Sequence, residues 1–283
     1  MRIGQHASAF PAPGPSEDAG GLLAETGTTS PGCDVTVTTR NVTRSRRTPR
    51  PMAAPGACRA PAPGKTAALL SVCFFVAHLH ARLLASSRRS SEDRAAVFER
   101  GDDLVIVVAD GAGGLRGGAA AGDTLVEVVR GMLADRAIDV HDARAWMGAF
   151  RAADLNLAAE MAGETTAVLV VVGKHEIVGI SAGDSEAWLV NADSIDDLTG
   201  SQKRMRLGSG RMIPIPFHRS LVRGSLVVAT DGLFKYAAVD AIAAAVRTEG
   251  EADTITRHVA SLAQTQAGTY HDDLAVVVVP LDP

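Results

Sequence analysis

The sequence predicts an α+β domain in which two packed antiparallel β-sheets are sandwiched between layers of α-helices. Two observations indicate this class. Runs rich in Val, Leu and Ile follow one another across short turns, whereas a parallel pair would need a crossover of about a dozen residues. Stretches with Ala, Leu, Arg and Glu at helical spacing come in pairs between groups of these runs. We therefore expect antiparallel sheets covered by helices.

Seven runs have the composition of buried strands. They are residues 95–98, 103–109, 166–172, 176–181, 186–190, 225–230 and 273–279. Gly173 and Lys174 supply a turn between the third and fourth of these runs. The fourth run continues almost directly into the fifth, so residues 166–190 are predicted to form one antiparallel meander.

Four stretches have helical periodicity: residues 117–135, 142–162, 237–248 and 252–266. Residues 192–224 break the pattern, because they are mixed in charge, rich in glycine and contain Pro214 and Pro216. We interpret them as a long, flap-like surface excursion. Excursions of this length in a compact domain are usually functional or disordered.

The first 65 residues differ in composition from the rest of the chain. Nine of the thirteen prolines lie there, with eight Lys or Arg against four Asp or Glu. Such a Pro/Ala/Arg-rich leader buries too little apolar surface to offset the entropy of ordering, so residues 1–65 are expected to be disordered. Residues 66–283 are expected to form the folded domain, with the run at 67–77 as a buried first strand.

The cellular setting follows from cysteines and hydropathy. Cys33, Cys58 and Cys73 form no CxxC pair, so neither a disulfide framework nor a thiolate metal site is indicated, and a cytoplasmic location is expected. The apolar run at 67–77 is too short to span a bilayer, which takes about 20 residues. Neither a membrane nor a nucleic acid is expected as a partner.

Acidic residues gather at the predicted strand ends. Asp110 and Asp231 each follow a strand-like run and precede glycine. Further acids flank other strands at Asp184, Asp272-Asp273 and Glu92-Asp93. If these ends share one sheet edge, like charges about 4 Å apart at an effective dielectric near 20 repel by roughly 4 kcal/mol per pair. All-oxygen sites without Cys or His select Mg²⁺ or Mn²⁺, so the pattern predicts a metal platform.

Two other interpretations of these residues stay open at this stage. A single Asp-Gly after a strand is also the composition of an ordinary turn. The glycine-rich segment 111–117 follows a strand and opens a helix, as in a dinucleotide-binding turn. Asp110 argues against that second interpretation, because a carboxylate there would repel a pyrophosphate.

Six segments together resemble the protein phosphatase 2C family of metal-dependent serine/threonine phosphatases, of the bacterial type. They are SEDR at 91–94, VVADGAGG at 107–114, GETTAVLVVV at 163–172, SAGDSEAWLV at 181–190, LVVATDGLFKY at 226–236 and HDDLAVVVV at 271–279. The resemblance covers residues 85–280 in the family's order. No single segment is specific, but the set is.

The resemblance implies a set of metal ligands. Asp110 matches the aspartate that bridges two Mn²⁺ or Mg²⁺ ions, and the carbonyl of Gly111 adds a ligand that a glycine, lacking Cβ, leaves accessible. The other matching positions are Asp231 and Asp272, the pair Glu92-Asp93, and Asp184, which matches the ligand of a third ion in bacterial members.

The resemblance also implies the reaction. Arg88, four residues before Glu92, matches the arginine that binds substrate phosphate, with Arg89 as a neighbouring alternative. A metal-activated bridging water would attack phosphoserine or phosphothreonine on proteins, with Asp110, Asp231, Asp272 and Arg88 as the catalytic set. Phosphorylated proteins and an opposing serine/threonine kinase are the implied partners.

One departure keeps a second function open. Ala112 stands where many family members carry a histidine proposed to protonate the leaving group. A catalytically weak, phosphatase-like regulatory or partner-binding module is therefore the alternative.

Overall fold

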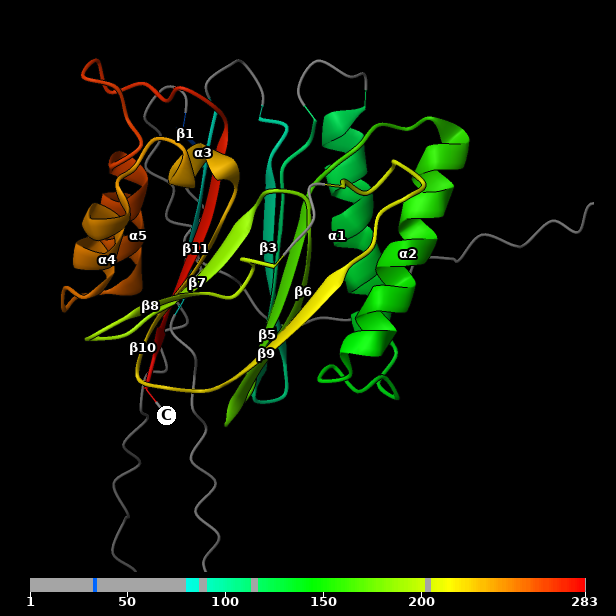
Figure 1. Ribbon diagram of the computed structural model, residues 1–283, viewed down its shortest axis with the longest axis horizontal. Helices are drawn as coiled ribbons and strands as arrows, with labels where there is room; N and C mark the ends of the chain where they lie inside the picture. Colours follow the sequence, from blue (N-terminus) through cyan, green and yellow to red (C-terminus); the bar gives the residue numbers. More distant parts are fainter. Residues whose placement is uncertain (1–32, 35–79, 87–90, 113–116, 202–204, 283) are drawn as a thin grey trace, which may run out of the picture.

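The computed structural model describes residues 33–34, 80–86, 91–112, 117–201 and 205–282 (Figure 1). The run at 67–77 and all but two residues of the leader lie outside the described residues. A first strand at 67–77 and a disordered leader therefore stay predictions, as does the domain boundary at residue 66.

Two antiparallel sheets form the centre of the domain. The first has the strand order β1 (Cys33–Asp34), β2 (Ala81–Ala85), β11 (Leu274–Leu281), β10 (Gly224–Ala229), β7 (Glu186–Val190) and β8 (Ile195–Asp197). The second has the order β3 (Arg94–Arg100), β4 (Asp103–Ala109), β5 (Ala167–Val172), β6 (Glu176–Ala182) and β9 (Ile215–Ser220). All of these described neighbours pair antiparallel, as the sequence predicts.

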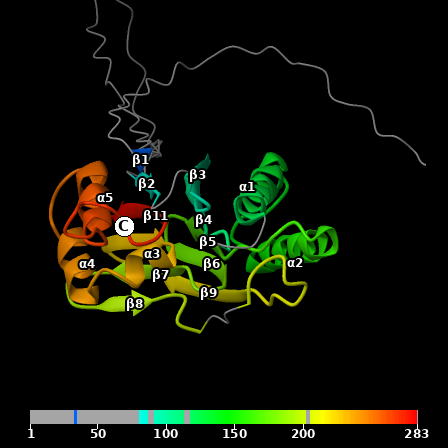
Figure 2. The same ribbon diagram turned by 90° about the horizontal axis from the view of Figure 1, so that it is seen from above.

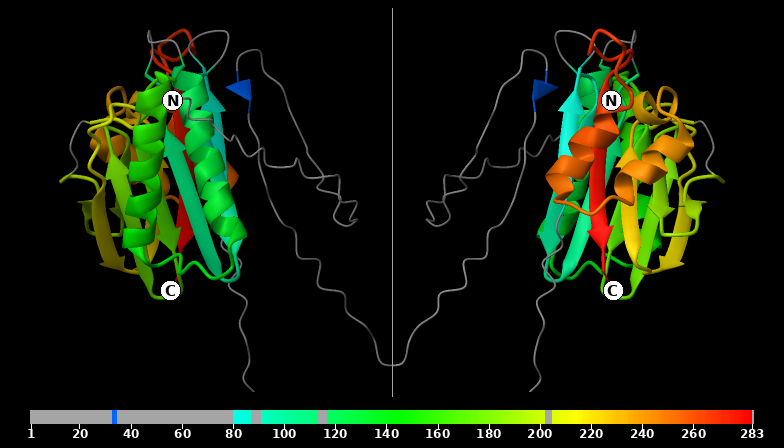
Figure 3. Two further views of the ribbon diagram at one scale, coloured as in Figure 1. Left: turned by 90° about the vertical axis from the view of Figure 1, so that its right-hand side faces the viewer. Right: turned by 90° about the vertical axis from the view of Figure 1, so that its left-hand side faces the viewer.

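Helices cover the outer face of each sheet. The described helices are α1 (Gly118–Ala134), α2 (Ala143–Glu160), α3 (Asp231–Phe234), α4 (Val239–Val246) and α5 (Ala252–Ser261). Figure 2 shows α1 and α2 on one side of the two sheets and α4 and α5 on the other. The two views of Figure 3 show each helix pair lying across its own sheet. The predicted sandwich is confirmed.

Three layers of apolar side chains hold this arrangement together. One layer fills the space between the sheets, and Ile106 and Val228 are both fully buried in it. A second lies between β3–β6 and the pair α1 and α2, where Trp146 and Phe150 are fully buried. The third lies under α4 and α5. Strands β4, β5, β10 and β11 are buried on both faces, which explains their continuous Val, Leu and Ile runs.

The predicted meander at 166–190 is wrong in its second half. Strands β5 and β6 form a hairpin, but β7 pairs with β10 in the other sheet. The chain crosses between the sheets at residues 183–185. Gly183 makes this crossing with φ +96°, and a Cβ there would lie 2.7 Å from the Thr166 side chain. The sequence shows two adjacent strands but not that the chain changes sheets between them.

The excursion at 192–224 contains two strands that the sequence does not indicate. Strand β8 extends one sheet beside β7, and β9 extends the other beside β6. Pro216 is tolerated within β9 because this is an edge strand. The segment is thus anchored at both ends by strand pairing and is not an irregular loop throughout. Among the described residues, no helix has the length and apolar character needed to cross a bilayer.

Candidate metal centre

Three of the predicted acidic residues converge at one end of the sandwich. Asp110 follows β4, Asp184 lies in the crossing from β6 to β7, and Asp231 begins α3 directly after β10. One carboxylate oxygen from each lies within 4.8 Å of those of the other two. We call these residues the acidic cluster. It lies where α3 begins, at the upper end of the view in Figure 1.

The two glycines that follow the cluster aspartates stand where no side chain fits. A Cβ on Gly111 would lie 2.5 Å from the backbone of Gly118 and 2.8 Å from the carbonyl oxygen of Glu92. A Cβ on Gly232 would lie 2.1 Å from the carbonyl oxygen of Asp273. Glycine at these two positions therefore lets the backbone of Glu92 and of Asp273 approach the residues that follow Asp110 and Asp231. This packing is a second reason for Gly111, beside the predicted access of an ion to its carbonyl.

Threonine side chains fix the backbone of Asp110. Its N–H donates to Thr166 Oγ1 at 2.8 Å, and its carbonyl accepts from the Thr166 N–H at 2.8 Å and from the Thr165 hydroxyl at 3.0 Å. Thr166 Oγ1 also lies 2.6 Å from Ser185 Oγ. Because Ser185 follows Asp184, this hydrogen bond links the segment before β5 to the crossing that carries Asp184. The sequence does not indicate these roles of Thr165 and Thr166, although two polar residues directly before a wholly apolar strand are a signal.

The surroundings of Asp110 favour its protonated form when no cation is bound. Burial raises the pKa of Asp110 to about 7, and the charges of Asp231, Asp184 and Asp272 act in the same direction. The positive charge of Arg206 opposes them. The pKa of this carboxyl group, which is ordinarily near 3.8, is thus raised by burial and by neighbouring charges to about 7.

Two side-chain cations contact the acidic cluster. Burial raises the pKa of Asp231, while the ion pair with Lys235 one helical turn later lowers it. The guanidinium of Arg206 lies 3.8 Å from Asp184 Oδ1. The pKa values of Asp110 and Asp231 stay raised despite these two cations, first because both carboxyl groups are buried and second because of the neighbouring acids.

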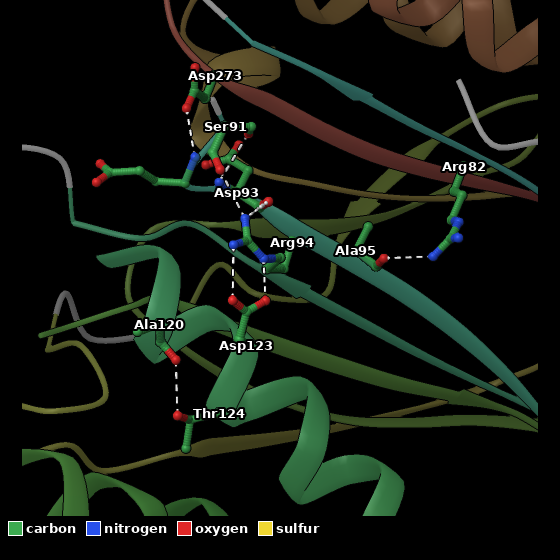
Figure 4. Close-up of polar contacts among 10 residues, drawn as sticks. Arg82, Ser91, Asp93, Arg94, Ala95, Ala120, Asp123, Thr124 and Asp273 are labelled. Carbon is green, nitrogen blue, oxygen red and sulfur yellow. Dashed lines mark hydrogen bonds and ion pairs between the residues drawn. The ribbon is translucent and has the colours of Figure 1, made fainter. Parts of the chain in front are cut away.

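Asp93 is the buried member of the predicted Glu92-Asp93 pair. Only 2% of Asp93 is exposed, and its Oδ2 has no hydrogen-bond partner. Burial raises the pKa of Asp93 well above its usual range, and the charge of Asp110 adds to the effect. Figure 4 shows how Arg94 holds this segment: it donates to the carbonyls of Ser91 and Asp93, both at 2.9 Å, and forms a two-point ion pair with Asp123 of α1.

The structure places Glu92, Asp272 and Asp273 beside the acidic cluster in different ways. The Glu92 N–H donates to Asp273 Oδ2 at 2.8 Å, and the Ser86 hydroxyl donates to Asp273 Oδ1 at 3.1 Å. Asp273 therefore joins the start of β11 to two other segments. Asp272 is not one of the three clustered residues, although its charge contributes to raising the pKa of Asp110. Arg88 and Arg89 lie outside the described residues.

The residues present fit hard divalent cations. The donors are carboxylates, without Cys or His among the three clustered residues. Asp184 Oδ1 and Asp93 Oδ2 are buried oxygens without hydrogen-bond partners, which a cation would satisfy. Removal of protons from Asp110 and Asp93, whose pKa values are raised, is the usual accompaniment of metal binding.

A cavity in the described part of the chain lies away from the acidic cluster. It has a volume of about 1300 Å³ and lies at the opposite ends of β10 and β11, beside Gly224 and Leu281. Its lining mixes charges of both signs, including Lys174, Arg247 and Glu249. We place the candidate site at the acidic cluster because buried carboxylate oxygens that lack hydrogen-bond partners lie in it, at Asp184, and beside it, at Asp93, whereas a cavity alone supplies no chemistry.

Comparisons with known proteins give the fold a family context. No family model matches the chain, and no curated protein matches it. The solved structures it is similar to include the serine/threonine phosphatase Stp1 from Staphylococcus aureus, with a TM-score of 0.64 at 20% identity over 72% of this chain and 95% of that one. The serine/threonine phosphatase of S. agalactiae gives a TM-score of 0.64 at 20% identity over 72% and 100%.

A third similar structure was solved with metal. It is the catalytic domain of the serine/threonine protein phosphatase PstP in complex with two manganese ions, with a TM-score of 0.63 at 18% identity over 73% of this chain and 99% of that one. At these identities the similarity establishes the fold. The chain has the fold of bacterial serine/threonine phosphatases, and the resemblance predicted from its sequence is confirmed at that level.

Proposed function

We propose that this protein hydrolyses phosphoserine and phosphothreonine on proteins, using two Mn²⁺ or Mg²⁺ ions. The observation that carries the proposal is the convergence of Asp110, Asp184 and Asp231, from three separated segments, to within 4.8 Å. The fold supports it, because similar structures are named as serine/threonine phosphatases and one of them holds two manganese ions.

Different acidic residues would bind different ions. Asp110 would bridge them, with Asp231, Asp272, Asp93 and the Gly111 carbonyl completing the ligands. Asp184 would bind a third ion and Glu92 would act through water. When bound, the ions would neutralise the carboxylates and activate water for attack at phosphorus.

The chain's own cations would orient the substrate. A guanidinium binds phosphoryl oxygens through paired N–H groups, which is the role proposed for Arg88.

Ala112 is 3% exposed and its N–H donates to the Glu164 carbonyl at 2.9 Å, so this position is structural. Because an alanine has no proton to give, the leaving alkoxide would take its proton from an ordered water or from another acid. The partners are phosphorylated proteins and the kinase that modifies them, and the cysteine content favours the cytoplasm.

The alternative is a phosphatase-like module that binds a partner without turnover. The observation that favours it is the pairing of Asp231 with Lys235 and of Asp184 with Arg206, since side-chain cations occupy two of the acids. The two proposals differ in whether divalent ions support turnover.

The deciding experiment measures hydrolysis of p-nitrophenyl phosphate and of a phosphothreonine peptide with Mn²⁺, with Mg²⁺ and with EDTA. We expect turnover that chelation abolishes and that Asp231→Asn lowers by about 100-fold or more. Asp196→Asn is the matched control, because Asp196 pairs with Arg219 on β9, away from the cluster. Turnover that survives EDTA would rule out the metal mechanism. Absence of turnover together with tight Mn²⁺ binding would favour the partner-binding module.

A further inference from the structure

Asp154 is a completely buried carboxylate outside the acidic cluster. It lies on α2 with 0% of its surface exposed, facing the segment that connects β8 to β9. A buried charge is costly unless it is fully hydrogen-bonded, so its partners indicate what it is there to hold.

The partners of Asp154 are backbone amides of one loop. Its Oδ1 accepts from the N–H groups of Gly208 and Gly210, both at 2.9 Å. Its Oδ2 accepts from the Met212 N–H at 3.2 Å and from Arg151, whose guanidinium also donates to the Met212 carbonyl at 3.1 Å. A single carboxylate thus organises residues 208–212.

The same loop reaches the acidic cluster through its first residues. Leu207 exchanges two backbone hydrogen bonds with Thr165, at 2.8 and 3.0 Å, and the Thr165 hydroxyl donates to the carbonyl of Asp110. Arg206 precedes Leu207 and places its guanidinium 3.8 Å from Asp184 Oδ1. Hydrogen bonds therefore fix the backbone of this loop at two places, at Leu207 beside Thr165 and at residues 208–212 beside Asp154.

Ser209 contacts both Arg206 and Asp154. Its hydroxyl donates to the Arg206 carbonyl at 2.7 Å and lies 3.5 Å from Asp154 Oδ1. Gly208 adopts φ +94° beside it, and a Cβ there would lie 2.1 Å from the Gly163 carbonyl oxygen. The loop is thus packed against the end of α2 in one conformation, with Arg206 at its cluster end.

Arg206 has the chemistry of a phosphate ligand. Its side chain is 34% exposed, so its N–H groups are accessible from solvent while the guanidinium stays at the cluster. A planar guanidinium beside metal-held oxygens suits a phosphoryl group, whose charge it would share with the ions.

We propose that Asp154 is a positioning residue: by holding residues 208–212 it keeps the guanidinium of Arg206 at the acidic cluster, where Arg206 binds the phosphoryl group of the substrate. The inference rests on the proposed phosphatase function. It adds a phosphate ligand on the β8–β9 connection and a buried residue that sets its position.

The test is a double-mutant cycle with Asp154→Asn and Arg206→Ala. The asparagine keeps the oxygen that accepts from Gly208 and Gly210 but loses the acceptor for Met212 and Arg151. The readouts are KM and kcat for a phosphothreonine peptide and inhibition by inorganic phosphate. We expect Arg206→Ala to raise KM and the phosphate inhibition constant about tenfold. Asp154→Asn should raise both by a smaller factor, and the double variant should be no worse than Arg206→Ala.

Two further readouts separate positioning from general instability. Hydrogen exchange of the amides of Gly208, Gly210 and Met212 should accelerate in Asp154→Asn, while Mn²⁺ affinity by calorimetry stays within about twofold. Asp142→Ala is the matched control, since Asp142 caps the start of the same helix by accepting from the Arg144 N–H at 2.9 Å. It should lower the melting temperature without changing the phosphate inhibition constant.

Several results would overturn the inference. Multiplicative effects in the double variant would show that Asp154 does not act through Arg206. An unchanged phosphate inhibition constant in Arg206→Ala would remove the phosphate role. If Asp154→Asn does not fold, Ser209→Ala replaces it, with a rise in KM expected that disappears in the Arg206→Ala background.

Failure of the proposed function would look different. Wild-type protein would then show no Mn²⁺-dependent turnover, and binding of inorganic phosphate to the Mn²⁺-loaded protein, followed by calorimetry, becomes the readout. Phosphate affinity that still falls in Arg206→Ala and Asp154→Asn would support the positioning inference, and phosphate affinity equal in all three proteins would overturn it.

Discussion

Gly232 and Asp273 lie in backbone contact, so that a Cβ on Gly232 would stand 2.1 Å from the Asp273 carbonyl oxygen. This contact joins the residue after one cluster acid, Asp231, to the residue after another predicted ligand, Asp272. It brings the start of α3 against the start of β11 without any side chain between them.

Gly232→Ala is therefore expected to separate these two segments. Overpacking of this kind costs about 1–3 kcal/mol in the free energy of unfolding, and Mn²⁺ affinity should fall because Asp231 and Asp272 move apart. Denaturant unfolding and calorimetry measure the two effects. Gly131→Ala in α1 is the control, because its Cβ would meet nothing within 4 Å and Ala is the better helix former by about 1 kcal/mol. Unchanged Mn²⁺ affinity in Gly232→Ala would contradict the packing argument.

Stability of the metal-free protein should decrease as pH rises. The folded pKa of Asp110 is about 7, above an ordinary value near 3.8, because of burial first and the neighbouring carboxylates second. Between these values the folded state holds a proton that the unfolded chain has lost, so the free energy of unfolding falls as pH increases through the window. Chemical unfolding with EDTA at pH 5.5 and pH 8 measures this effect. A metal-free protein that is more stable at pH 8 would contradict the raised pKa of Asp110.

Mn²⁺ affinity should change with pH in the opposite direction. A cation displaces the proton from Asp110, so binding releases protons and strengthens as pH rises from about 5.5 to 8. Calorimetry in two buffers of different ionisation enthalpy measures the proton release directly. Equal heats in the two buffers would mean that Asp110 is already ionised and would contradict its raised pKa.

Asp110→Asn is expected to stabilise the metal-free protein while removing its response to metal. The substitution removes a charge that burial and Asp231 disfavour, so the free energy of unfolding without metal should rise by on the order of 2 kcal/mol. Added Mn²⁺ should raise the melting temperature of the wild type but not of the variant. Asp196→Asn serves as the surface control. A variant that is less stable than the wild type without metal would refute the idea that burial and neighbouring acids disfavour the charge of Asp110.

Arg94→Lys should weaken metal binding through Asp93. The guanidinium contacts the carbonyls of Ser91 and Asp93 and both oxygens of Asp123 at once, which an ammonium group cannot do. We expect Mn²⁺ affinity to fall about three- to tenfold, measured by calorimetry. Arg130→Lys is the control. The described acidic residue that pairs with Arg130 is Glu127, which is exposed and lies on the same helix. Equal affinities in the two variants would show that Arg94 does not position the segment.

Much of the fold was predictable because its strands are buried on both faces. The runs that became β4, β5, β10 and β11 are short, continuously apolar and rich in β-branched Val, which is typical of strands buried on both faces. Strand β9 was not predictable for the opposite reason: within IPFHRS only Phe217 is buried, so the alternation that marks a strand is missing. The change of sheet at residues 183–185 depends on which strands pair at a distance, which local sequence does not encode.

The acidic residues of the site were predictable from their places at strand ends, whereas their supports were not. Asp110 and Asp231 share a pattern that appears twice in the chain. Thr166 and Asp154 accept hydrogen bonds from backbone N–H groups that lie more than 50 residues away in the sequence, and nothing in their neighbours along the chain indicates those partners. The metal and catalytic roles assigned to the acids stay predictions that the experiments above test.

The acidic cluster draws one residue from the end of β4 in one sheet, one from the end of β10 in the other, and one from the crossing between them. Substitutions that slide one sheet over the other would therefore separate the three clustered carboxylates even if each sheet stayed intact. Side chains at the interface between the sheets should tolerate less change in volume than those beneath α1 and α2 or beneath α4 and α5, where a shift moves a helix and leaves the ligands together. Adaptive change in this protein should accordingly accumulate in the outer layers.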